Sequence, residues 1–108
     1  MTTLYQLHST IDDLRHSVEE MGRTWCRGGY IILLGATVAY IDWLQVYLTE
    51  CEIDAISEIY ALQSDIDALS EHTKKTLELE NKPIVILTDS EWVTTIHHPQ
   101  FTKVVTLS

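Results

Sequence analysis

Two histidines and an aspartate near the amino terminus have the spacing of metal ligands. His8, Asp12 and His16 follow one another at intervals of four residues, which would place them along one side of a helix. Imidazole and carboxylate groups both bind zinc. No HExxH sequence and no pair of closely spaced cysteines accompanies them, so we expect surface histidines here and no metal site.

Cys26 is a second candidate for chemistry, because Arg23 and Arg27 lie close to it in the sequence and neighbouring cations favour the nucleophilic thiolate. A cysteine that follows a tryptophan at a helix end is more often a packing residue. The chain also has no P-loop, GxGxxG sequence, nucleophile elbow or CxxC pair. We therefore predict a protein that is not an enzyme and needs no cofactor.

The two cysteines, Cys26 and Cys51, are too few for a disulfide framework. The first residues contain no basic segment followed by an apolar one, as a secretory signal would. We therefore expect free thiols and a cytoplasmic location, where thiols stay reduced.

Negative charge is the strongest feature of the composition. The 108 residues include 16 acids and 7 bases, which gives a net charge of −9. No lysine or arginine occurs between Arg27 and Lys74, and eight acids fall in that interval. A field of this sign repels phosphate backbones and anionic lipids and attracts basic surfaces. The apolar fraction of 45% is that of a globular protein, so we predict a single domain over residues 1–108.

The first elements that would position these side chains are predicted to be a helix and a hairpin. The helix would begin between residues 3 and 9 and end near residue 26, because seven apolar side chains recur at steps of three and four residues. Two short β-branched and aromatic segments, at residues 30–34 and 37–41, flank a glycine turn and predict a β-hairpin. The seven apolar positions of the helix are Leu4, Leu7, Ile11, Leu14, Val18, Met21 and Trp25.

A long amphipathic helix is predicted over residues 42–80, because apolar side chains form one stripe at about 100° per residue. A second apolar patch lies off this stripe, which indicates that another segment or another chain covers it. With Trp25, its members are the residues that we expect in an oligomer contact: Val46, Ile53, Ile56 and Tyr60. Acids gather on the opposite side of the helix, and we predict that they bind the partner: Glu50, Asp54, Glu58, Asp65, Asp67 and Glu71.

The rest of the chain is predicted to form strands. Asn81 to Pro83 should end the long helix. Residues 84–88, 92–96 and 101–107 are β-branched or aromatic, although Ser90 could instead cap a short helical turn in the second segment. The order predicts an α+β fold, with an N-terminal helix, a β-hairpin, a long amphipathic helix and a C-terminal β-rich segment that form a small, mostly antiparallel sheet.

These features favour a small acidic binding protein that inhibits a basic, nucleic-acid-handling partner protein by covering the partner's nucleic-acid-binding surface as a nucleic-acid mimic. Its acids would prevent direct binding to nucleic acid. In size and acidity the chain resembles phage anti-defence proteins, including anti-CRISPR proteins, and nuclease immunity proteins. This resemblance is one of composition, without a shared motif, and it assigns no residue.

Two alternatives remain open. The chain could be an assembly protein whose function is its own oligomer, and we expect a homodimer. Residues 28–49 have the length of a membrane span, but Asp42, Gly35 and Gln45 make insertion unfavourable. Binding to a basic partner should weaken with salt, whereas a hydrophobic oligomer should not.

Overall fold

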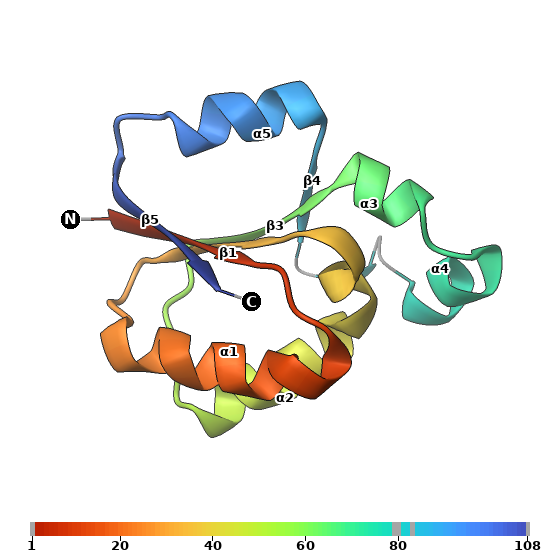
Figure 1. Ribbon diagram of the computed structural model, residues 1–108, viewed down its shortest axis with the longest axis horizontal. Coiled ribbons are helices and arrows are strands. Elements are labelled where there is room, and N and C mark those ends of the chain that lie inside the picture. The colour runs from red at the N-terminus through yellow and green to blue at the C-terminus, as the bar shows by residue number, and fades with distance from the viewer. Residues whose placement is uncertain (1, 79–80, 83, 108) are drawn as a thin grey trace.

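The computed structural model describes residues 2–78, 81–82 and 84–107. Its centre is a parallel sheet with the strand order β4-β3-β2-β1-β5 (Figure 1). Helices connect the strands, so the chain has a Rossmann-like α/β fold. The strands are β1 (Thr2–Leu7), β2 (Tyr30–Leu33), β3 (Glu58–Leu62), β4 (Val85–Leu87) and β5 (Phe101–Leu107). The helices are α1 (Ile11–Thr24), the 3-10 helix η1 (Gly35–Tyr40), α2 (Ile41–Glu50), α3 (Gln63–Asp67), α4 (Glu71–Leu77) and α5 (Asp89–Ile96).

The predicted α+β fold with its antiparallel sheet is wrong. Parallel neighbours need a crossover between them, so each of β1 to β4 is followed by helix before the next strand begins. Residues 30–33 form a strand as predicted, but the second half of the expected hairpin is η1. The expected strand at residues 92–96 is part of α5, which begins with a capping box between Thr88 and Glu91.

The predicted continuous helix over residues 42–80 is also wrong, because this segment contains α2, β3, α3 and α4. The chain leaves α2 through Glu52 and Ala55, whose φ angles are 57° and 52°. This left-handed conformation cannot continue a right-handed helix. The acids expected on one helical side are therefore distributed over four elements and the loops between them.

The predicted first helix is confirmed for α1, where Leu14, Val18 and Met21 are buried. Leu4 and Leu7 do not belong to it, because they lie in β1. β1 has a neighbouring strand on each side and is covered on both faces, so the consecutive residues Leu4 and Tyr5 are both buried although they point to opposite faces. The predicted strands at residues 84–88 and 101–107 are confirmed by β4 and β5.

The two faces of the sheet are covered unequally (Figure 1). α1, η1 and α2 pack on one face, where Tyr5, Leu7 and Ile31 join their side chains in the main core. On the other face lies α5 alone, and none of its eight residues is buried. A parallel sheet normally has both faces covered by helices, so the α5 face is the one on which cover is incomplete.

The segment considered as a membrane span folds as β2, η1 and α2. In the described part of the chain, no helix combines the length and the apolar character needed to cross a bilayer.

Candidate interaction surface

The carboxyl ends of parallel strands are where ligands usually bind in open α/β sheets. Here a cleft of about 450 Å³ opens at that edge, with Trp92 beside His8, Ser64, Asp65 and Asp89. All four polar residues directly follow strands or begin the next helix, which is why the topology brings them together although they are far apart in sequence.

Both carboxylates of this cleft already have partners within the chain. Asp65 Oδ2 accepts a hydrogen bond from the Gly35 backbone N–H at 2.9 Å, and Asp89 Oδ1 accepts one from Ser64 Oγ at 3.0 Å. Among the described lining residues there is no lysine, arginine or cysteine. Two acids without a base disfavour phosphate ligands, and the cleft offers no thiol nucleophile.

The possible metal ligands do not line one helix. His8 lies beyond the end of β1, whereas Asp12 and His16 are in α1. His16 Nε2 is 3.7 Å from Glu20 Oε1, one turn further along the same helix. Within residues 2–78, 81–82 and 84–107, no group of three or more histidine, cysteine or acidic side chains is arranged to hold a metal ion.

The acids of the base-free interval receive bases from elsewhere in the chain. Arg15 lies 3.5 Å from Glu50, and Arg27 lies 3.0 Å from Asp54. Asp42 pairs with Lys82 at 2.6 Å, and Glu71 pairs with Lys74 at 3.3 Å. Four of the eight acids are thus paired with residues outside the interval or at its boundary. The expected uniformly unpaired acidic surface does not form, although the net charge is unchanged by these contacts.

Three of the predicted partner-binding acids have other surroundings. Asp65 is tied to Gly35 in the carboxyl-edge cleft, and Asp67 accepts a hydrogen bond from Gln63 Nε2 at 2.8 Å. Glu58 is exposed at the start of β3, on the same side of the sheet as α5. The six predicted acids therefore lie in several places, and Glu58 is the one that lies on the incompletely covered face.

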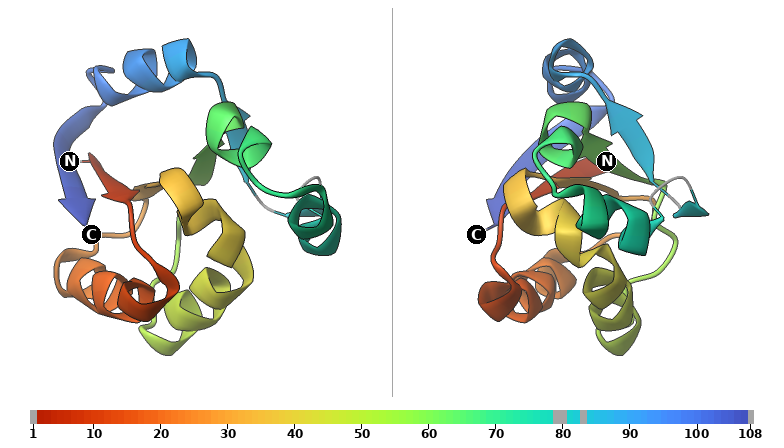
Figure 2. Two further views of the ribbon diagram at one scale, coloured as in Figure 1. Left: turned by 45° about the vertical axis from the view of Figure 1, so that its right-hand side comes forward. Right: turned by 90° about the vertical axis from the view of Figure 1, so that its right-hand side faces the viewer.

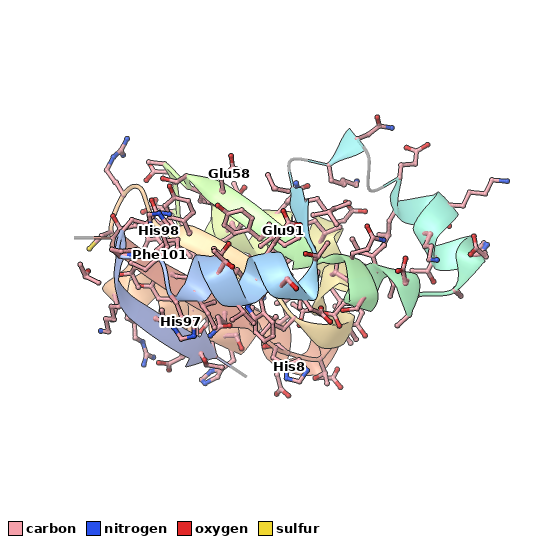
Figure 3. All side chains as sticks on the ribbon, turned by 90° about the horizontal axis from the view of Figure 1, so that it is seen from above. His8, Glu58, Glu91, His97, His98 and Phe101 are labelled. Atoms are coloured by element: carbon pink, nitrogen blue, oxygen red, sulfur yellow. The ribbon has the colours of Figure 1, made fainter. Side chains whose placement is uncertain are left out.

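Aromatic rings concentrate on this face near the amino ends of the strands. Strand pairing places Tyr30 and Tyr60 on it, because Ile32 pairs with Tyr60 and shares a face with Tyr30. The two tyrosine rings stack with centroids 6.1 Å apart, and Phe101 packs edge-on against Tyr30 at 5.0 Å. Figure 3 looks down on this face, with Glu91 on α5, Phe101 beyond the end of that helix, and Glu58 and His8 on opposite sides of it.

We call the part of this face beside β3 and β4 the open flank, and define it by Glu58, Tyr60 and Val85. Val85 pairs with Tyr60 and is 39% exposed. A cleft of about 480 Å³ continues from it, lined by Ile56, Glu58 and Val85 together with Ser57, Ile59 and Ile84. Apolar and aromatic side chains beside one exposed carboxylate are typical of a protein-binding surface.

The environment of Tyr60 changes the pKa of its phenol hydroxyl. Partial burial raises the pKa of Tyr60 above its ordinary value, and the neighbouring Tyr30 and Glu58 raise it further. The phenol therefore stays neutral at physiological pH, which suits a hydroxyl that takes part in a contact surface and not one that acts as a base.

The predicted oligomer-contact residues do not form a single patch. Ile53 is buried in the main core, and Trp25 packs against Tyr5 while its indole N–H donates to the Asp54 carbonyl at 2.9 Å. Val46 is 48% exposed, but it lies on α2, which covers the opposite face. Ile56 packs against the main core, so of the predicted contact residues only Tyr60 lies on the open flank.

The cysteines lie far from the carboxyl-edge cleft in the topology, in the connections that lead from α1 and α2 to the amino ends of β2 and β3. Both are free. Burial raises the pKa of the Cys51 thiol, with added effects of Glu19 and Glu50 that Arg15 partly offsets. Cys51 is therefore a weak nucleophile at neutral pH.

Sequence reasoning missed the carboxyl-edge cleft, although one signal was present. His8, Gly35, Ser64 and Thr88 each follow an apolar segment directly or within two residues, as residues at the ends of buried parallel strands do. Comparison of the chain with models of known protein families, with curated protein sequences and with solved structures gives no match in any of the three.

Proposed function

We propose that this protein is a non-enzymatic binding protein that holds a basic partner protein against its open flank. The observation that supports the proposal is the incomplete cover of a parallel sheet. Tyr60 and Val85 lie on a face that such folds normally bury under helices, and Glu58 supplies an exposed acid beside them.

Charge favours a basic partner over a neutral one. Five of the seven basic side chains, namely Arg15, Arg23, Arg27, Lys74 and Lys82, form ion pairs within the chain. The protein carries a net charge of −9, which speeds encounter with a positive surface and leaves the chain few free bases of its own. Proteins that handle nucleic acids have such surfaces, and a partner of that kind would be inhibited when its surface is covered. The free thiols of Cys26 and Cys51 fit a cytoplasmic site of action.

The test is affinity capture from a lysate of the protein's own cells, with mass spectrometry of the captured proteins. Val85→Glu places a charge in the open flank and should abolish capture. Val46→Glu is the matched control, because Val46 is similarly exposed but lies on α2. Capture should persist in this control and should weaken steeply between about 50 and 500 mM salt, as electrostatically steered binding does.

Two results would contradict the proposal. Capture that survives Val85→Glu but fails with Val46→Glu would place the interface on α2. A captured partner without a basic surface, whose binding does not depend on salt, would remove the electrostatic argument.

A second candidate, assembly into a homo-oligomer, is favoured by a separate feature of the sheet, the outer edge of β5.

A further inference from the structure

β5 is the last strand of the sheet and is hydrogen-bonded on one side only, to β1. Figure 2 shows it running along the outside of the molecule, with α1 beneath the sheet and α5 above it. It is seven residues long, whereas the opposite edge strand, β4, has three. Proteins usually shorten or block their edge strands, because unpaired backbone groups bind other strands. The edge formed by β4 is protected by its short length, whereas the edge formed by β5 is long enough to pair with another strand.

The direction of the free backbone groups follows from one hydrogen bond. The Leu107 carbonyl accepts from the His8 N–H at 2.9 Å, so the backbone of Leu107 points toward β1. Because backbone direction alternates along a strand, Val105 and Lys103 also point toward β1, while Val104 and Thr106 point outward. The register shifts at Thr2 and Thr3, which makes Thr102 the extra residue of a bulge. The regular free edge therefore runs from Lys103 to Leu107.

The side chains of this edge are those of a strand that lacks a neighbour. Val104 is 41% exposed, and Thr102 and Thr106 are exposed as well. Lys103 is the single charge between Phe101 and Leu107, and the segment contains no proline. Apart from that lysine and the bulge, nothing in β5 opposes pairing.

We propose that β5 pairs antiparallel with β5 of a second copy of this chain, about a two-fold axis at Val104. This register joins the outward-pointing Val104 residues as a hydrogen-bonded pair and sets Thr106 opposite Thr102 of the second copy. Lys103 then faces Val105 of the other chain. A register centred on Lys103 would instead oppose two lysines, which is unfavourable, so the charge selects between the alternatives.

The pairing would join the two sheets of five strands into one continuous sheet. Opposed residues of an antiparallel pair point to the same face, so both α5 helices would lie on one side. Each copy would keep its open flank, because β4 and β5 are at opposite edges of the sheet. The inference therefore does not rest on the binding function proposed above, and the dimer would present that surface twice.

Cysteine cross-linking tests the register. In a Cys26→Ser, Cys51→Ser background, Val104→Cys should form a disulfide-linked dimer with oxidised glutathione, because the paired Cα atoms would be about 5.5 Å apart. Thr106→Cys is the matched control on the same free edge. Its two copies would lie four residues apart along the strands, roughly 14 Å, so it should not cross-link with itself.

Light scattering over a concentration series tests the assembly without cysteines. Wild type should have about twice the chain mass of 12.4 kDa, and the dimer should tighten as salt screens two negative chains. Val104→Pro should give the monomer mass with unchanged circular dichroism, because its lost N–H points away from β1. Val85→Glu should remain dimeric even where it loses the partner. A monomer mass for wild type at every concentration, equal cross-linking of both cysteine variants, or a dimer that resists Val104→Pro would each overturn the pairing.

Discussion

The indole nitrogen of Trp92 donates a hydrogen bond to the side-chain oxygen of Gln6 at 3.2 Å, joining residues 86 positions apart in the sequence. This bond joins α5 to β1, the strand next to the β5 edge, and it holds a helix that contributes no buried residue of its own. Leu87 of β4 is buried beside α5, whereas Val85 of β4 and Val104 of β5 remain exposed. The indole of Trp92 thus helps to fix the position of α5 over this face of the sheet.

Trp92→Phe should lower the free energy of unfolding by about 1 kcal/mol, the usual net value of a hydrogen bond that leaves a partly buried acceptor unpaired. Urea denaturation measures this change. Trp43→Phe is the control, since the Trp43 side chain is 55% exposed and its replacement should change stability by less than about 0.5 kcal/mol. Equal effects of the two substitutions would show that the bond to Gln6 does not hold α5.

Replacing Gly35 or Gly22 by alanine should change the stability of the protein in opposite directions. At Gly35 the φ angle is +59°, and an added Cβ would lie 2.6 Å from His8 Nε2, so Gly35→Ala should destabilise the fold by about 1–2 kcal/mol. At Gly22, inside α1, the nearest atom to an added Cβ is 3.8 Å away, so Gly22→Ala should stabilise it by roughly 0.5–1 kcal/mol. Thermal denaturation of both variants measures the difference.

A double variant separates the two causes at Gly35. Removing the imidazole with His8→Ala should recover the steric part of the loss in Gly35→Ala, but not the part due to the left-handed backbone. Complete recovery would mean that the backbone conformation costs nothing.

Part of the fold was readable from the sequence. The strands β1 to β4 begin at residues 2, 30, 58 and 85, so apolar segments recur about every 28 residues, a spacing that suits repeated strand and helix units. The helical periodicity from Leu44 to Leu77 led to the wrong prediction of one long helix. It arises because the apolar residues of α2, β3, α3 and α4 fall near one stripe when the segment is drawn as a helix. Left-handed residues at Glu52 and Ala55 break the helix, and neither residue type signals that conformation.

The candidate surface was less predictable, because it depends on pairing across the sheet. The base-free interval correctly indicated an acidic chain, but Arg27 reaches Asp54 and Lys82 reaches Asp42 from 27 and 40 residues away. Local composition cannot show such contacts. Tyr60 was predicted to be a contact residue from a helical pattern. It lies on the open flank for a different reason, its position in β3 opposite Val85.

Thr37 should be important for the carboxyl edge of the sheet. Its Oγ1 accepts from the Ser9 N–H at 2.8 Å and donates to the Ser9 carbonyl at 3.1 Å, and both residues are buried. Thr37→Val would leave the Ser9 backbone groups unpaired, at a cost of about 1–3 kcal/mol. Thr94→Val, on the exposed side of α5, is the control and should change stability by less than about 0.5 kcal/mol. A loss of similar size in both variants would contradict the role of this bond.

Tyr60 should make the stability of the protein depend on alkaline pH. Burial, Tyr30 and Glu58 raise the pKa of its phenol in the folded state, whereas an unfolded tyrosine titrates near about 10. The folded state therefore retains the proton that the unfolded state loses. Its contribution to stability is complete below about pH 10 and disappears as the pH rises through the folded-state pKa.

The measurement is ultraviolet titration of wild type and Tyr60→Phe at about 295 nm. The difference between the two curves isolates one of the five tyrosines, and its midpoint should lie above the value for an unfolded chain. Urea denaturation between about pH 9 and 11 should show a steeper loss of stability in wild type than in Tyr60→Phe, because only wild type releases this proton on unfolding. Glu58→Gln should lower the Tyr60 midpoint by removing the neighbouring charge. A midpoint at or below about 10 in wild type would mean that Tyr60 is solvated, and the open flank would then not be the apolar surface to which we assign partner binding.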